Sequence, residues 1–195
     1  IVPGFVCMHA HGGSGHDFNE CTEEAFRSIV QAHLKHGATS FYPTISSSPF
    51  SKLHQAAHVC ERLMEEPDSP ILGLHIEGPY LSRKMAGEQF AGQVKEIDEQ
   101  EYRELVENTR CIRRWDASPE LPGALEFAGY LREKGILAAI SHTEAEYDDI
   151  CAAYKAGFTH AAHFYNAMPG FHKRREYKYE GTVESVYLTD GMTIE

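Results

Sequence analysis

The sequence has too few positive charges to bind nucleic acid through a general basic surface. It carries 18 Lys and Arg residues against 29 Asp and Glu residues, which gives a formal net charge of −11. A protein that binds a phosphate backbone needs a basic stripe to displace counterions. We therefore expect no nucleic-acid partner. An anionic ligand must be held by a local group of cations, and the densest group is His172-Lys173-Arg174-Arg175.

Long apolar runs and paired cysteines are also missing. No stretch approaches the roughly 18 apolar residues of a membrane span, and no basic-then-apolar leader opens the chain. The five cysteines are odd in number and widely spaced, with no Cys-x-x-Cys pair, which is typical of reduced, packed thiols. We expect a cytoplasmic protein without membrane contact. Because the chain opens with Ile1 rather than Met, we also expect both of its ends to be cut.

Strand and helix patterns alternate along the chain. Helical periodicity follows Thr22 and ends at Gly37, a second helix begins at Ser51, and a third runs from Asp98 to Asn108. Six apolar strands are predicted near residues 5–11, 38–44, 72–77, 111–116, 136–142 and 158–163. Strands that alternate with helices indicate a parallel sheet with right-handed crossovers.

Four of the predicted strands end in residues that can bind a metal. These ends are Cys-Met-His9-Ala-His11, Leu-His75-Ile-Glu77, Ile-Ser-His142-Thr143 and Ala-Ala-His163. The carboxyl ends of successive parallel strands meet at one edge, and a divalent metal needs three or four convergent ligands. The pattern therefore predicts an α/β fold, a (β/α)8 TIM barrel of a metal-dependent hydrolase with about six βα units present. Thr143 is also placed to cap the helix that follows it.

Each of these residues also has a structural interpretation. His9 and His11 lie two apart and share a strand face, so they either chelate a cation or are ordinary solvated or packed histidines. Glu77 would be costly to bury alone, so it requires either a metal or a Lys or Arg partner. We interpret His75 as a core residue. His160 lies three residues before His163 on a predicted strand and so faces the other way, and we interpret it as structural.

Several longer stretches carry a family resemblance. They are Pro3 to Gly13, Leu74-His-Ile-Glu-Gly-Pro-Tyr80, Ile140-Ser-His-Thr143 and His163-Phe-Tyr-Asn-Ala-Met-Pro169. In this order, and over essentially the whole chain, they resemble the N-acetylglucosamine-6-phosphate deacetylases of the amidohydrolase superfamily. The resemblance implies that Glu77, His142 and His163 are the principal ligands of a divalent metal, usually zinc. It also implies that His9 and His11 match the His-x-His pair that holds a second metal where deacetylases retain it.

The resemblance further implies a substrate and its contacts. The reaction would be hydrolysis of N-acetylglucosamine 6-phosphate to glucosamine 6-phosphate and acetate. Asn166 and Ala167 would contact the sugar phosphate, and Gln89 would contact the substrate. Arg174 or Arg175 would bind the phosphate, donated to the site of a neighbouring subunit in a homodimer.

Two departures from the family pattern stand out. Cys7 occupies the position where the superfamily usually has an aspartate, and the catalytic aspartate is expected beyond Glu195. Asp190 comes too soon after the sixth predicted strand to be assigned that role. We expect residues 1–195 to form a partial barrel domain without the amino-terminal small β domain and the last two βα units, inactive and poorly soluble alone. Two alternatives stay open: a related amidohydrolase acting on another N-acyl or cyclic amide, and a metal-holding fragment without catalysis.

Overall fold

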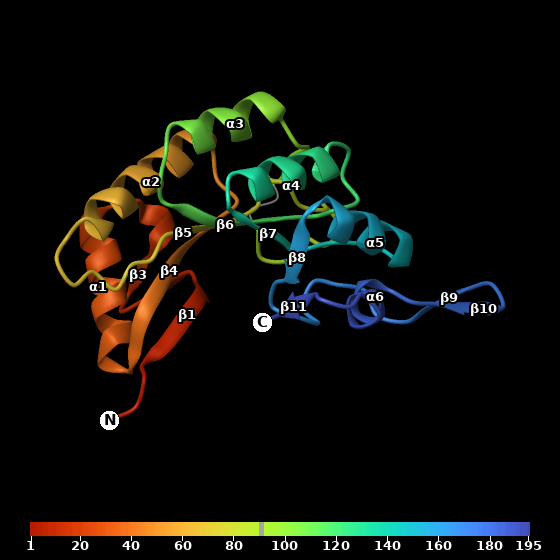
Figure 1. Ribbon diagram of the computed structural model, residues 1–195, viewed down its shortest axis with the longest axis horizontal. Coiled ribbons are helices and arrows are strands. Elements are labelled where there is room, and N and C mark those ends of the chain that lie inside the picture. Colours follow the sequence, from red (N-terminus) through yellow and green to blue (C-terminus); the bar gives the residue numbers. More distant parts are fainter. Residues whose placement is uncertain (90–91) are drawn as a thin grey trace. The chain divides into compact units, whose positions relative to one another are not determined.

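The computed structural model describes residues 1–89 and 92–195, which form two compact units (Figure 1). The first unit comprises residues 1–76 and 100–113, and the second comprises residues 77–99 and 114–195. Within the described residues, none of the helices is both long and apolar enough to cross a membrane.

Strands and helices alternate in both units. The first unit contains β1 (Phe5–Ala10), β2 (Gly12–Gly13), β3 (His16–Asp17), a 3-10 turn (Phe18–Glu20), α1 (Glu23–Lys35), β4 (Ala38–Ser46) and α2 (Phe50–Met64). Three elements have residues in both units: β5 (Leu74–Glu77), α3 (Glu99–Glu107) and β6 (Ile112–Ala117). The second unit continues with α4 (Ala124–Glu133), β7 (Leu137–Ile140), α5 (Tyr147–Ala156), β8 (Phe158–Ala161), β9 (His172–Arg174), β10 (Tyr177–Tyr179), α6 (Thr182–Tyr187) and β11 (Thr193–Ile194).

The first unit shows how local sequence sets an element. The side chain of Thr22 accepts a hydrogen bond from the backbone N–H of Ala25 at 3.2 Å and so caps the amino terminus of α1. The helix buries the face that the periodicity predicts, with Ala25, Phe26, Ile29 and Val30 inside. It stops before Gly37, whose φ of +95° suits glycine. The predicted helix between Thr22 and Gly37 is therefore confirmed.

The sheet is parallel in each unit. In the first unit the strand order is β1-β4-β5-β6, and Phe5 of β1 lies opposite Ala38 of β4. In the second unit the order is β5-β6-β7-β8-β11, with Asp116 opposite Ala139. All six predicted strands are present, as β1, β4, β5, β6, β7 and β8. Five further strands in the described part of the chain were missed: β11, which pairs in parallel with β8, and the strands of the antiparallel pairs β2-β3 and β9-β10. At two or three residues each, they are too short to show a sustained strand period.

An aromatic cluster forms the core of the second unit beside the end of β5. The fully buried Trp115 stacks on Tyr80, with 6.0 Å between ring centroids, and meets Phe127 edge-on at 5.4 Å. Such ring pairs contribute about 0.5–1.5 kcal/mol beyond the apolar area that they bury. The indole N–H of Trp115 also donates to the carbonyl oxygen of Gly78 at 2.8 Å. The cluster therefore fixes the backbone directly after Glu77.

Candidate metal centre

Glu77, His142 and His163 come together at strand ends of the second unit. Glu77 is the last residue of β5, and the two histidines each lie two residues beyond the ends of β7 and β8. The Nε2 atoms of both histidines lie 3.1 Å from Oε1 of Glu77. Their rings meet edge-on with 4.9 Å between centroids. This is the convergence that the ends of parallel strands are expected to produce.

Backbone carbonyls fix the orientation of both imidazoles. Nδ1 of His142 donates to the carbonyl oxygen of Met85 at 2.8 Å, and Nδ1 of His163 donates to that of Asn166 at 3.0 Å. A carbonyl only accepts, so the Nδ1 atoms carry the protons and each neutral ring turns an Nε2 lone pair toward Glu77. Three acceptor atoms therefore face one another. That donor set repels itself unless a proton or a cation lies between its members, and it fits a divalent metal.

Glu77 is buried in this cluster, with only 2% of the residue exposed. Its second oxygen, Oε2, accepts a hydrogen bond from Nε2 of Gln89 at 2.6 Å. Burial opposes charging of the His142 imidazole, but the hydrogen bond and negative charge of Glu77 outweigh it, so the pKa of His142 is raised. A divalent cation that takes the place of this proton would meet two nitrogens and one carboxylate oxygen, ligands that suit zinc.

Both histidines stand on left-handed backbone. The φ angles are +45° at His142 and +33° at His163, a region that few residues other than glycine adopt. Such positions cost about 1–3 kcal/mol each and persist only when the surroundings hold them. One restraint is the backbone N–H of Thr143, which donates to the carbonyl oxygen of Ala167 at 3.1 Å. This bond ties the loop that carries one histidine to the loop that carries the other.

Ser118 provides a second restraint on the His142 loop. Its hydroxyl donates to the carbonyl oxygen of His142 at 2.8 Å and accepts from the backbone N–H of Ser82 at 2.6 Å. Ser118 is fully buried at the end of β6. One hydroxyl therefore connects the loops that follow β5 and β7.

Glu120, in the loop after β6, provides a third restraint on the His142 loop. Its carboxylate accepts from the hydroxyl of Thr143 at 2.5 Å and from the backbone N–H of Glu144 at 2.7 Å. Burial raises the pKa of Glu120, although these hydrogen bonds oppose the rise. The expectation that Thr143 caps the next helix is wrong, because the N-cap of α5 is Glu146. The Thr143 hydroxyl instead donates to Glu120 and accepts from the backbone N–H of Ala145 at 2.9 Å.

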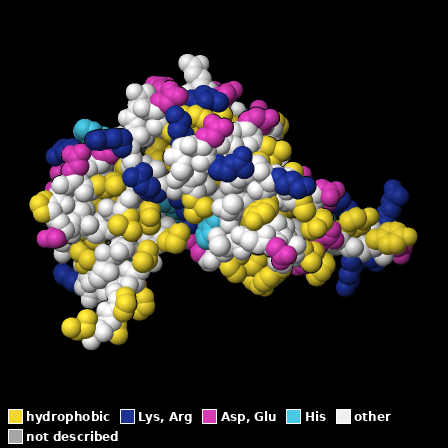
Figure 2. Space-filling view, in the orientation of Figure 1, with side chains coloured by type: hydrophobic (Ala, Val, Ile, Leu, Met, Phe, Trp, Pro, Cys, Tyr) yellow, Lys and Arg dark blue, Asp and Glu magenta, His cyan; other side chains and the backbone are white. Residues whose placement is uncertain are grey.

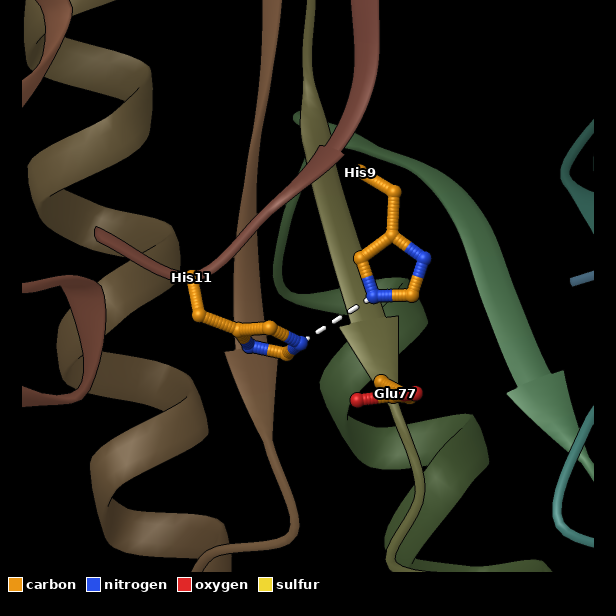
Figure 3. Close-up of side chains that lie close together, drawn as sticks. All are labelled: His9, His11 and Glu77. Atoms are coloured by element: carbon orange, nitrogen blue, oxygen red, sulfur yellow. Dashed lines mark hydrogen bonds between the residues drawn. The ribbon is translucent and has the colours of Figure 1, made fainter. Parts of the chain in front are cut away.

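His9 and His11 form a histidine pair in the first unit (Figure 3). Their Nε2 atoms lie 3.1 Å apart, a distance at which the two nitrogens share one proton or one cation. His11 is oriented by a 3.0 Å hydrogen bond between its Nδ1 and the hydroxyl of Ser46. The fully buried His75 bonds to Thr44 through Nδ1 at 3.0 Å and meets the His9 ring edge-on, as a packed core residue would.

Cys7, Asp190 and His160 were not assigned to the site from the sequence, and their surroundings are as follows. The thiol of Cys7 lies 3.9 Å from the carbonyl oxygen of His9. Asp190 is exposed in the turn between α6 and β11. His160 is buried and bonds through Nδ1 to the hydroxyl of Thr193 at 2.8 Å, which agrees with its structural interpretation.

The sequence profile of the amidohydrolase family matches residues 1–192. The chain belongs to this family. N-acetylglucosamine-6-phosphate deacetylases of Lysinibacillus sphaericus and Haemophilus influenzae are 28% and 29% identical to it, in matches that cover 100% of the chain and 50% and 51% of those proteins. The chain thus spans about half the length of the curated relatives it matches.

Solved structures of deacetylases also resemble the chain. N-acetyl-D-glucosamine-6-phosphate deacetylase of Mycobacterium smegmatis superposes with a TM-score of 0.90 at 30% identity, covering 99% of this chain and 49% of that one. The enzyme of Pasteurella multocida gives a TM-score of 0.90 at 29% identity, with 98% and 50% covered. The fold is therefore part of a (β/α)8 barrel of the metal-dependent amidohydrolase type, and the predicted fold class is confirmed.

The residues expected to contact substrate, Gln89, Asn166 and Ala167, lie in the loops that follow β5 and β8. Asn166 is exposed, and its backbone carbonyl is the acceptor for His163. Ala167 is half-buried on the same loop, with a left-handed φ of +53°. Gln89 is buried, and its side-chain amide donates to the carboxylate of Glu77.

The basic group predicted at His172–Arg175 lies on a two-stranded hairpin of β9 and β10. Figure 2 shows Lys or Arg side chains beside hydrophobic ones over this hairpin. Arg174 forms an ion pair with Glu146 and lies over the ring of Tyr179, with 5.1 Å to its centroid. Arg175 is exposed in the turn, at a left-handed φ of +54°. The hairpin was missed in the sequence, although the alternation of Tyr177 and Tyr179 gave a short period-two signal.

A buried ionic network in the second unit was also missed. The guanidinium of Arg114 binds both oxygens of Asp116, at 2.7 and 2.9 Å, and both oxygens of Glu195, at 2.7 and 3.0 Å. Asp116 is fully buried. Arg114 and Asp116 lie two apart on β6 and so share a face, which is the only local signal that the sequence gives for this pair.

Proposed function

We propose that this amidohydrolase hydrolyses the acetamide of an N-acetylated amino-sugar 6-phosphate, N-acetylglucosamine 6-phosphate, to the amino-sugar phosphate and acetate. The observation that carries the proposal is the convergence of Glu77, His142 and His163 with both imidazole tautomers fixed. The named activity of the similar deacetylases supports the substrate.

We propose that these three side chains hold one divalent ion, zinc. Such an ion, when bound, supplies a Lewis acid for the acetamide carbonyl and lowers the pKa of a water molecule. Residues of the chain itself fix the orientation of the two imidazoles. Nδ1 of His142 and of His163 already carries a proton, and Nε2 of each ring would be occupied by the ion, so neither imidazole would take the proton of the attacking water. The proton acceptor is therefore a different group, and the family resemblance puts an aspartate in that role beyond Glu195.

Further substrate and metal contacts belong to the same proposal. His9 and His11 are proposed as ligands of a second ion, supported by the 3.1 Å approach of their Nε2 atoms. Asn166 and Ala167 are proposed to contact the sugar phosphate. Of the two arginines, we assign the phosphate to Arg175, because Arg174 is already paired with Glu146. The resemblance places this cation in the site of a neighbouring subunit, which implies a homodimer.

Metal analysis of single variants tests the ligand set. Glu77→Ala, His142→Ala and His163→Ala should each lose most of the bound metal after dialysis, because loss of one ligand from a small set weakens binding strongly. His58→Ala, an exposed histidine on α2, is the matched control and should keep it. Stoichiometric metal in all three ligand variants would refute the assignment.

The substrate needs a test with both epimers of the amino sugar. An N-acetylgalactosamine-6-phosphate deacetylase of Escherichia coli O157:H7 is 27% identical to the chain, close to the identity of the glucosamine enzymes. Acetate release from each 6-phosphate should be measured with the complete protein. A higher kcat/KM on the glucosamine substrate supports the proposal, and a preference for the galactosamine substrate or for an unphosphorylated amide contradicts it.

A further inference from the structure

Gln89 makes a bond that the family resemblance does not lead one to expect. The resemblance assigns it to the substrate, but its Nε2 donates to Oε2 of Glu77 at 2.6 Å. Gln89 is only 9% exposed, so this bond is shielded from water. A hydrogen bond from an amide to a buried carboxylate is charge-assisted and strong.

The two carboxylate oxygens of Glu77 have different partners. Oε1 faces Nε2 of His142 and Nε2 of His163, each at 3.1 Å, whereas Oε2 is held by Gln89. A glutamate has three side-chain torsions and can rotate either oxygen, or both, toward a cation. With Oε2 held, one oxygen is presented to the ion.

The same loop also positions a second ligand. The carbonyl oxygen of Met85, four residues before Gln89, accepts the Nδ1 proton of His142 at 2.8 Å. Between them Gly87 has a φ of +58°, and a Cβ added there would lie 3.8 Å from Cε1 of His142. The loop from Met85 to Gln89 therefore contacts both His142 and Glu77, and Gly87 allows its turn.

We propose that Gln89 is a positioning residue that holds Glu77 as a one-oxygen ligand, and that its amide is committed to the metal site rather than to the substrate. The proposal rests on the proposed function, since it takes Glu77, His142 and His163 as the ligand set. It predicts that Gln89 controls metal affinity and coordination number. A substrate contact would instead control KM.

The first experiment measures metal affinity by competition with a chromophoric chelator. Gln89→Leu, which keeps the volume and removes the amide, should weaken Zn²⁺ binding about 10- to 100-fold, the usual effect of losing a partner of a metal ligand. Gln93→Ala, which changes a half-buried glutamine in the segment between β5 and α3, is the matched control and should bind like the unmodified protein. Circular dichroism of each variant checks that the fold is unchanged.

The second experiment reads the coordination directly with Co²⁺. The visible absorption of Co²⁺ weakens as its coordination number rises from four, so Gln89→Leu should show a weaker band than the unmodified protein as Glu77 gains freedom to bind through both oxygens. Unchanged Zn²⁺ affinity together with an unchanged Co²⁺ spectrum overturns the proposal. An increase in KM with metal affinity unchanged overturns it in favour of a substrate contact. If the unmodified protein binds neither ion, the proposed function fails instead.

Discussion

Replacing Arg114 with methionine should destabilise the second unit strongly. The arginine side chain is 3% exposed, and it is the cation between the carboxylates of Asp116 and Glu195. Asp116 is fully buried, so water cannot take the place of the guanidinium. Methionine keeps most of the volume of the arginine stem and removes only the charge and the donors. The variant therefore isolates the loss of the ionic network.

The magnitude follows from the bonds that Asp116 loses. Two charge-assisted hydrogen bonds end on its oxygens, at 2.7 and 2.9 Å, and each such bond contributes about 1.5–3 kcal/mol. Removing one partner of a buried ion pair costs about 3–5 kcal/mol, because the other charge stays buried and unpaired. Each kcal/mol lowers Tm by about 2–4 °C in a chain of this length. We therefore expect a fall in Tm of about 6–20 °C.

Thermal unfolding followed by circular dichroism provides the measurement. Arg113→Met is the matched control, because Arg113 is exposed on the neighbouring position of β6 and should shift Tm little. The double variant Arg114→Met/Asp116→Leu removes the stranded carboxylate and should recover much of the loss. A double variant as unstable as the single one, or a single variant that unfolds with the control, would refute the reasoning.

Three more predictions follow from the metal site and the hairpin. The pKa of His142 is raised in the metal-free protein, and metal binding needs the neutral ring. Metal affinity should therefore increase with pH until the pH exceeds that pKa, and then level off. A flat pH profile in chelator titrations would contradict this. Glu120→Ala should lower the free energy of unfolding by about 1–3 kcal/mol, because the Thr143 hydroxyl and the Glu144 N–H lose their acceptor. Thr143→Val, which loses the bond to Glu120 and the bond from the N–H of Ala145, should lower it by a similar amount. Denaturant titration measures both variants, and an unchanged free energy of unfolding in either would argue against the bracing role. Arg175→Ala should raise KM for the phosphorylated sugar more than Arg174→Ala does, with little change for the unphosphorylated sugar; steady-state kinetics on both sugars tests this, and equal increases would count against the assignment.

The convergence of the three strand-end side chains could be predicted because their positions depend on a simple rule. Parallel strands that alternate with helices must present their carboxyl ends at one edge. Glu77, His142 and His163 each end an apolar stretch, so sequence order alone was enough to expect them together. The helix that follows Thr22 could also be predicted, because its apolar face depends on residues only three or four positions apart.

The remaining contacts depend on loop conformations that the sequence does not encode locally. The bond from Gln89 to Glu77 spans twelve positions, and the bond from Arg114 to Glu195 spans 81. Neither produces a periodic pattern. Glu120 was missed as well, because its partners lie in the loop after another strand, 23 and 24 residues away. These bonds were visible only once the strand order placed the loops beside one another.

The position of the single tryptophan gives the protein an optical reporter of its own. Trp115 is the only indole in the chain, and its N–H is bonded to the carbonyl of Gly78, the residue that follows Glu77. Indole emission depends on hydrogen bonding and on the polarity around the ring, and this ring is fully buried. Movement of the Glu77 strand end as an ion enters would therefore alter the fluorescence of an unlabelled sample, so that ion uptake can be followed in real time without a dye.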